Sequence, residues 1–396
     1  MADRLRVALL IESWGGYGRR VLRGIAAYAR AHGPWAFFHE ERDLGTRLPK
    51  NLEEWRPDGI IARLTGARLI RQVRQMGLPM VNLTLAAGTE DIPGVTSRPE
   101  SIVRLAIDHF LERGFQHFAY CGFPGALFSE LRAKCYQEAL AEHDRPVHLF
   151  ASSPRSRKMS LAESEAYALG RAEKLAQWLQ GLPKPVALLA CNDKRGQQVA
   201  AACAELGIDV PDQVAVLGID NDDVQCELCN PPLSTIDPNV EQVGYEAAAL
   251  LDRLIAGEPP PPTLILVEPS RVVVRRSTDV LAIANREMAE AVRFVRDHAC
   301  DPELEIEDLV AQLDLSRKTL DRWFQKCLGR SPHEEIARVR LARIQDLLAT
   351  TTLPPDEIAL LSGFGHVGSM CRMMKRMTGQ SPGEYRQSRI LKCPKM

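Results

Sequence analysis

The chain has 396 residues, more than one ordinary hydrophobic core organises, so we expect two or three domains. Its composition, 45% hydrophobic and 26% charged, is typical of a globular protein, and no apolar run approaches the roughly 20 residues of a membrane helix. The net charge of −1 hides a basic end, because residues 316–396 hold 15 Lys and Arg against 7 Asp and Glu. Such a segment predicts a polyanionic partner.

The first residues and the cysteines predict a cytoplasmic protein. The apolar run Val7–Ile11 is too short for the core of a signal peptide, and no small-residue cleavage pattern follows it. Of the ten cysteines, only Cys226 and Cys229 form a CxxC pair, and neither a second pair nor a histidine stands at ligand spacing. We therefore expect reduced thiols, no bound metal ion and no cofactor.

Up to about residue 280, short apolar strands alternate with amphipathic helices. The strands are predicted at Leu5–Ile11, Gly59–Ala62, Pro79–Leu83, His117–Cys121, Val186–Cys191 and Val214–Ile219. Strands that are apolar almost throughout are typical of parallel sheets buried on both faces, so the predicted class is α/β, doubly wound. More than nine such strands would make an unusually wide open sheet. We therefore predict two lobes within residues 1–280, with the chain crossing between them near residues 100 and 235.

Polar and aromatic side chains follow these strands, at the edge where doubly wound sheets bind ligands. Carboxylates, amides and guanidinium groups pair with sugar hydroxyls, and aromatic faces pack against the C–H surface of a sugar. A local role is the alternative for each residue, since Asn192–Asp193 would also make a good helix N-cap. The candidate ligand-binding residues are Glu12, Tyr17, Arg63, Phe128, Arg132, Asn192, Asp193, Asp220 and Asn221.

Catalytic motifs are missing from this part of the sequence. The glycines of Gly15-Gly-Tyr-Gly18 do not have the GxGxxG spacing of a dinucleotide site. A Walker lysine, a GxSxG elbow and an HExxH pair are also absent. We therefore expect no catalytic residues and no enzyme activity.

The strand pattern ends after Asp279, and residues 286–396 are predicted to be helical, with helix-turn-helix motifs near residues 306–327 and 355–377. In the first motif a short helix bearing Ile306, Leu309, Val310 and Leu313 precedes a basic helix capped by Ser316. A longer helix from Glu334 to about Ala349 separates this motif from its repeat. An all-helical dimerisation bundle is the alternative, but a bundle does not require two basic helices after tight turns.

Basic and polar side chains on the second helix of each motif are candidates for DNA contacts. A connecting helix of about 16 residues spans roughly 24 Å, which would place the two basic helices about one DNA turn apart. The pattern does not distinguish base contacts from phosphate contacts. The candidates are Arg317, Lys318, Thr319, Arg322 and Lys326 in the first motif, and His366, Ser369, Arg372, Lys375 and Arg376 in the second.

Three stretches of the first part resemble a known family. They are Leu188-Leu-Ala-Cys-Asn-Asp-Lys194, Gly207-Ile-Asp-Val-Pro-Asp-Gln-Val-Ala-Val-Leu-Gly-Ile-Asp220 and Pro232-Leu-Ser-Thr-Ile236. In order and content they are similar to the effector domain of lactose- and galactose-repressor relatives and of periplasmic sugar-binding proteins. The resemblance implies a two-lobed periplasmic-binding-protein-like fold, with a sugar held by Arg132, Asn192 and Asp220.

The last part resembles the arabinose-regulator (AraC) family. The first motif ends on Gly329-Arg-Ser-Pro332, and the second on Gly379-Gln-Ser-Pro-x-Glu-Tyr-Arg386, which is highly specific for that family. Met370 and Met374 stand where the family usually has aromatic residues, and methionine fills much of the same core volume. This resemblance implies sequence-specific binding of operator DNA.

The two parts in this order resemble the xylose-operon regulators of bacteria. That resemblance implies an activator that responds to a xylose-like pentose, acts with RNA polymerase and forms a homodimer through its sensor domains. Three alternatives stay open: a different sugar or polyol, repression in place of activation, and a pocket that serves only dimerisation. Glu12 stands where a neutral amide is expected, so the sequence does not identify the sugar.

Overall fold

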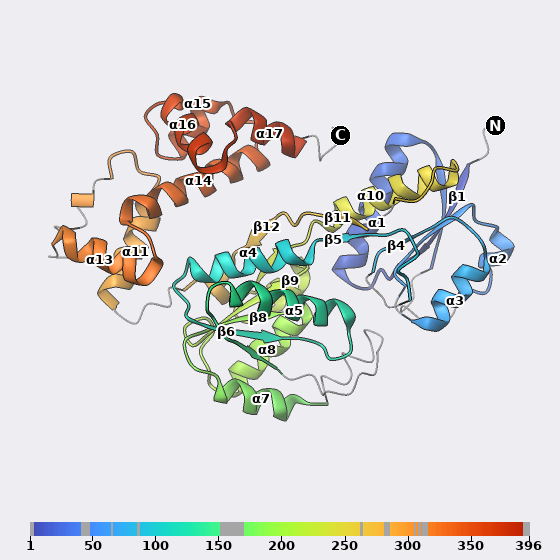
Figure 1. Cartoon of the computed structure of the whole chain (residues 1–396), viewed down its shortest axis with the longest axis horizontal. Helices are drawn as coiled ribbons and strands as arrows, with labels where there is room; N and C mark the ends of the chain where they lie inside the picture. The colour runs from blue at the N-terminus through green and yellow to red at the C-terminus, as the bar shows by residue number, and fades with distance from the viewer. Residues whose placement is uncertain are drawn as a thin grey trace. The chain divides into compact units, whose positions relative to one another are not determined.

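The computed structural model describes residues 4–40, 48–64, 66–84, 88–150, 170–261, 264–280, 286–304, 306–307, 310 and 316–390. Packing divides the chain into two compact units, residues 1–111 with 115–280 and residues 281–396 with the short segment 112–114. The first unit is α/β and the second is helical, which confirms the predicted fold class (Figure 1). None of the described helices is long and apolar enough to cross a membrane.

The first lobe is built on a four-stranded parallel sheet in the order β2-β1-β3-β4. A core of aliphatic side chains from this sheet and from two helices far apart in sequence covers one face. The strands are β1 (Leu5–Leu10), β2 (Trp35–His39), β3 (Gly59–Ala62) and β4 (Met80–Asn82). The helices are α1 (Gly16–His32), α2 (Leu52–Trp55), α3 (Ala67–Gln75) and α10 (Val240–Ile255).

Helices α1 and α10 approach each other through two glycines. A Cβ atom on Gly24 would lie 1.9 Å from the carbonyl oxygen of Glu241, and one on Gly244 would lie 2.1 Å from the carbonyl oxygen of Val21. Neither distance is sterically possible, so both positions require the absence of a side chain. The α1–α10 pair therefore owes its close packing to glycine on both helices.

The second lobe is built on a six-stranded sheet in the order β12-β10-β9-β8-β6-β7, in which only β12 is antiparallel. Strands β8 and β9 are buried along their whole length, which explains their uninterrupted apolar sequence. The strands are β6 (His117–Cys121), β7 (Val147–Leu149), β8 (Val186–Ala190), β9 (Val214–Ile219), β10 (Ser234–Asp237) and β12 (Arg271–Val273). The helices are α4 (Pro99–Leu111), α5 (Leu127–Ala141), α7 (Ala172–Gly181), α8 (Asp193–Glu205), α9 (Asp223–Leu228) and the 3₁₀ turn η1 (Arg276–Thr278).

Three crossover segments join the lobes, where the sequence predicted two. The first follows β5 (Val95–Ser97), the second links β10 to α10, and the third links β11 (Ile265–Val267) to β12. Hydrogen bonds tie them together: Ser97 Oγ donates to the Pro238 carbonyl at 2.6 Å, and Ser270 N donates to the Asp237 carbonyl at 2.8 Å. Strand β11 has three residues and follows a proline run, so no periodic signal marked the third crossing.

The helical unit contains two small cores joined by one long helix. In the first core Ile306, Leu320 and Phe324 are buried, and in the second Met370, Met373 and Met374 are. Most of the short helix predicted at Ile306–Leu313 lies outside the described residues. The described helices are α11 (Arg286–His298), α13 (Arg317–Leu328), α14 (Pro332–Thr350), α15 (Pro355–Leu361), α16 (Val367–Thr378) and α17 (Pro382–Ile390).

A fully buried carboxylate, that of Glu335 at the start of α14, organises the first half of this unit. Arg296 Nε and Arg330 Nε each donate to one of its oxygens at 2.6 Å, and Arg338 donates to both at 3.0 Å. Burial alone would raise the pKa of Glu335, but the hydrogen bond from Arg338 and the three positive charges outweigh it and lower the pKa to about 2. The group therefore stays ionised inside the core.

Candidate ligand and DNA-binding sites

Two charged side chains meet at the carboxyl edge of the first sheet. Glu12 follows β1 and Arg63 follows β3, and the two form an ion pair. The Arg63 guanidinium also lies over the ring of Tyr17, 4.5 Å from its centroid. Glu12 Oε2 and Arg63 Nε are both buried without a hydrogen-bond partner in the described structure. A buried acceptor and a buried donor therefore stand side by side, unsatisfied.

Arg132 and Asp220 of the second lobe lie within electrostatic range of Arg63. Asp220 directly follows β9, whereas Arg132 lies on α5 and donates to the Cys191 carbonyl at 2.5 Å. The Arg132 guanidinium lies 5.3 Å from the ring centroid of Phe128. Asp220 and Arg132 shift the pKa of Arg63 in opposite directions. Six of the nine candidate residues, from both lobes, thus gather in one place: Glu12, Tyr17, Arg63, Phe128, Arg132 and Asp220.

Burial shifts the pKa of each of three groups in this cluster in the direction that favours its neutral form. Desolvation lowers the pKa of Arg63 to about 10, and desolvation raises that of Asp220 to about 6 against the pull of Arg132 and Arg63. The phenol of Tyr17 has a raised pKa for the same reason, with a further contribution from Asp220, so it remains a hydrogen-bond donor. The cluster offers donors and acceptors of both signs, which suits a ligand rich in hydroxyl groups.

The other three candidates, Asn192, Asp193 and Asn221, have their side chains occupied locally. Asn192 caps α8 by accepting from Arg195 N at 2.9 Å, the alternative role that the sequence indicated. Asp193 accepts from Thr235 Oγ1 and from Asp222 N, and burial raises its pKa to about 7. Asn221 Nδ2 donates to the Asp237 carboxylate at 3.2 Å. Asp193 and Asn221 therefore shape the loop that carries Asp220.

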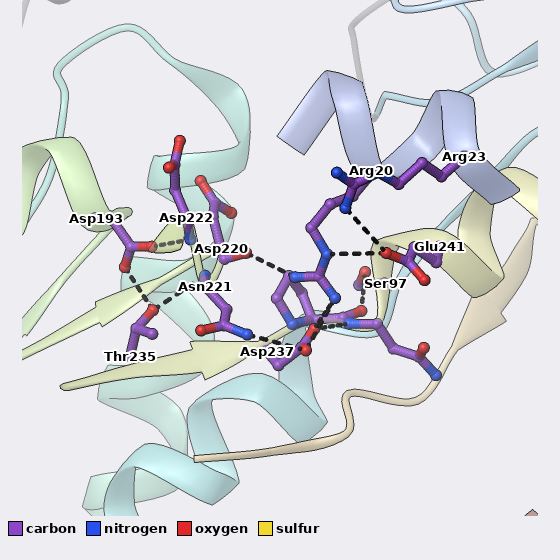
Figure 2. Close-up of polar contacts among 12 residues, drawn as sticks. Arg20, Arg23, Ser97, Asp193, Asp220, Asn221, Asp222, Thr235, Asp237 and Glu241 are labelled. Atoms are coloured by element: carbon purple, nitrogen blue, oxygen red, sulfur yellow. Dashed lines mark hydrogen bonds and ion pairs between the residues drawn. The ribbon is translucent and has the colours of Figure 1, made fainter. Parts of the chain in front are cut away.

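Three residues that the sequence analysis did not single out bridge the same region: Arg20, Asp222 and Asp237 (Figure 2). Arg20 Nη1 donates to the Asp220 carbonyl at 3.1 Å, and Arg20 Nη2 donates to both oxygens of Asp237 at 2.9 Å. Asp222 Oδ2 accepts from Gly16 N, at the start of α1, at 2.9 Å. The available signal was helical spacing, since Arg20 stands three residues after the candidate Tyr17.

The side chains that commonly bind metal ions are scattered among the described residues. Within them, no group of three or more His, Cys, Asp or Glu side chains is placed to hold a metal ion. Cys226 and Cys229, the CxxC pair, are both buried, and burial raises the pKa of each thiol.

The first basic helix of the second unit, α13, has the features predicted from the sequence. Ser316 caps it by accepting from Thr319 N at 3.2 Å, and Leu320 and Phe324 face the core. Lys318, Arg322 and Lys326 are exposed. Arg317 differs, because it forms ion pairs with Glu307 at 2.9 Å and Asp321 at 3.4 Å.

The second basic helix, α16, repeats this arrangement. It follows a turn at Gly363, which has a φ of +79° and where a Cβ atom would lie 2.9 Å from the Cys300 backbone. Met370, Met373 and Met374 occupy the core side of α16. The candidates His366, Arg372, Lys375 and Arg376 are exposed, and Ser369 is half-buried, 3.4 Å from Arg372 Nη2. Each motif therefore presents a basic surface on its second helix.

Family models and known relatives match both units. The models are the XylR N-terminal domain at residues 6–93, the periplasmic binding protein-like domain at 107–278 and a helix-turn-helix domain at 309–388. The chain is 29% identical to the xylose operon regulatory protein of Escherichia coli (strain K12), over 97% of both chains. It is 25% identical to the protein of that name from Haemophilus influenzae, over 96% of this chain and 98% of the relative.

A solved structure agrees in fold along the same length. The xylose-binding transcription activator XylR superposes with a TM-score of 0.60 and 27% identity, over 98% of this chain and 99% of that one. The chain is therefore a transcription regulator in which a periplasmic binding protein-like domain precedes a helix-turn-helix domain. Relatives that match it along nearly its whole length include the xylose operon regulatory proteins of Escherichia coli and Haemophilus influenzae.

Proposed function

We propose that the first unit binds a xylose-like pentose through the six clustered residues and that the chain activates transcription of a sugar-utilisation operon. The observation that carries the proposal is the buried, unsatisfied pair of Glu12 Oε2 and Arg63 Nε beside Asp220 and Arg132. A sugar hydroxyl can donate to the carboxylate oxygen and accept from the guanidinium nitrogen. Two of the relatives are xylose operon regulatory proteins, and the similar solved structure is that of a xylose-binding transcription activator.

The finer parts of the proposal concern partners. We infer a cytoplasmic homodimer that forms through the sensor units, binds operator DNA through α13 and α16, contacts RNA polymerase and catalyses no reaction. The relatives are regulators of transcription and not enzymes, and closed two-fold pairs are the commonest protein assemblies.

A sugar screen with the full-length protein tests the sensor assignment. Pentoses and hexoses are compared by thermal shift and calorimetry, because a ligand at 100 times its Kd adds about 2.7 kcal/mol of stability. The xylose shift should disappear in Asp220→Ala and in Arg132→Ala, and persist in Arg23→Ala, whose side chain is 73% exposed on α1. A wild-type protein that responds to no sugar would show that the pocket does not bind one, and a response to another sugar would replace xylose.

Operator binding tests the second unit. Arg322→Ala and Arg372→Ala should each weaken specific binding, by about 1–3 kcal/mol where the residue pairs with a guanine. Arg343→Ala is the matched control, because Arg343 is a half-exposed cation of the same unit on α14, 3.6 Å from Asp346. Unchanged affinity in the double variant Arg322→Ala/Arg372→Ala would refute the assignment.

Sugar and operator should also affect each other's binding. If sugar tightens operator binding by some factor, then operator must tighten sugar binding by the same factor. Both affinities are measured at one salt concentration, because phosphate contacts are salt-sensitive. Equal operator affinities with and without sugar, with no sugar-dependent change in DNA bending, would remove the switching function.

A further inference from the structure

The loop that carries Asp220 leaves β9 in an unusual backbone conformation. Asp220 has a φ of +123° and Asn221 a φ of +51°, and neither residue is glycine. Side chains other than hydrogen disfavour this region, so such a conformation persists only where surrounding contacts hold it. The direction in which the Asp220 carboxylate points depends on this backbone, so whatever holds the loop also sets the ligand geometry.

The second lobe accepts hydrogen bonds from all three N–H groups of this loop. Asp220 N donates to the Ile236 carbonyl at 3.0 Å, and Asn221 N donates to Thr235 Oγ1 at 3.2 Å. Asp222 N donates to Asp193 Oδ2 at 2.8 Å. The carbonyl oxygen of Asp220 accepts its hydrogen bond from Arg20, which lies on α1 of the first lobe.

Arg20 connects three parts of the structure through one guanidinium group. Its Nη1 contacts the Asp220 carbonyl, and its Nη2 contacts the carboxylate of Asp237 in the second crossover segment (Figure 2). The same carboxylate accepts from Asn221 Nδ2 at 3.2 Å and from Asn239 N at 2.8 Å. The Arg20 and Asp237 side chains are only 17% and 15% exposed, which protects the pair from solvent.

We propose that Arg20 is a positioning residue that helps to hold the loop 220–222 in its strained, ligand-presenting conformation. Tyr17 and Arg20 are one helical turn apart on α1, so the helix that presents Tyr17 to the ligand also fixes Asp220 on the opposite lobe. The loop makes all of these hydrogen bonds only when α1 lies against the second lobe. Sugar and Arg20 therefore favour the same closed state. The inference rests on the proposed function in that Asp220 contacts the effector.

The test compares Arg20→Gln with Arg23→Gln in the full-length protein. Arg23 lies on the same helix, 4.0 Å from Glu241, and does not reach the loop, so it is the matched control. Without sugar, amide hydrogen exchange at residues 220–222 should become faster in Arg20→Gln and stay at the wild-type rate in Arg23→Gln. Sugar affinity should fall roughly 10- to 100-fold in Arg20→Gln, which is the scale of releasing a strained backbone.

Two further variants separate positioning from general stability. Arg20→Lys keeps the charge opposite Asp237, but its single nitrogen cannot serve the acceptors that Arg20 reaches through two, so it should restore affinity only in part. Asp237→Asn should reproduce the Arg20→Gln loss. The losses in the double variant Arg20→Gln/Asp237→Asn should then be less than additive, because both single variants remove the contact between Arg20 and Asp237.

Each outcome has one meaning. Unchanged exchange at residues 220–222 in Arg20→Gln overturns the proposal, whatever the sugar results. Faster exchange with wild-type sugar affinity also overturns it, because the loop would then be held without setting ligand geometry. Faster exchange in a protein whose wild type binds no sugar refutes the proposed effector and supports the role of Arg20 in holding the loop.

Discussion

Replacing Glu335 with glutamine should destabilise the helical unit by an amount that depends on pH. The carboxylate has its pKa lowered from 4.5 to about 2 in the folded chain. That difference corresponds to about 3 kcal/mol at neutral pH, at the lower end of the 3–5 kcal/mol range for removing one partner of a buried ion pair. Because the folded pKa is the lower one, this stability is present above pH 4.5 and is lost as the pH falls, so that about half of it is gone by pH 3 and most of it by pH 2.

Calorimetry of the full-length protein between pH 7 and pH 3 measures this dependence. The transition of the helical unit should fall by more than about 10 °C in Glu335→Gln at pH 7, and the gap from wild type should narrow as the solution is acidified. Glu303→Gln is the control, because Glu303 is an exposed carboxylate of the same unit. A gap that stays constant with pH, or one below about 1 kcal/mol at pH 7, would refute the claim that three arginines hold Glu335 ionised.

Three further changes test other parts of the structure. Gly24→Ala should lower the thermal stability of the sensor unit by roughly 1–3 kcal/mol, since its Cβ would lie 1.9 Å from the Glu241 carbonyl oxygen; an unchanged melting temperature would contradict the close packing. Sugar affinity should fall between pH 7 and pH 5 as Asp220, with its pKa raised to about 6, takes up a proton, and Asp220→Asn should weaken that pH dependence in calorimetry, leaving the part due to Asp193, whose pKa is raised to about 7. Ser316→Ala should cost the helical unit about 1 kcal/mol in urea unfolding, because it removes the cap of α13, and equal midpoints would exclude that role.

Much of the fold could be predicted from the sequence because buried strands and helix faces show regular patterns of apolar residues. Strands such as β8 and β9 are apolar at every position, and the α13 core residues recur at helical spacing, so both were predicted. The third crossing was not, because a three-residue strand such as β11 is shorter than the window in which periodicity appears. The capping boxes at Ser331 and Ser381 have Glu three residues later, a pattern that the sequence displays directly.

The candidate site was harder to predict because residue type does not reveal what a side chain contacts. Six candidates lie close together, as a ligand site requires. The side-chain oxygen of Asn192, by contrast, caps helix α8. Arg20 was missed because its partners, Asp220 and Asp237, are about 200 residues away and come close only through the crossover segments. The helical spacing from Tyr17 places Arg20 on the same side of α1, but it does not indicate which distant residues the guanidinium contacts.

The interleaving of the two lobes has a consequence for how the chain is made. Helix α1 ends at His32, but its packing partner α10 does not begin until Val240, after most of the second lobe. At a translation rate of about 5–20 residues per second, α10 follows α1 from the ribosome by roughly 10–40 s. During that interval Val21 and Ile25, which are fully buried in the finished protein, lack the aliphatic face of α10 that covers them. The core of the first lobe is thus completed only after strands β6 to β10 of the second lobe have been synthesised, and the apolar face of α1 stays uncovered until then.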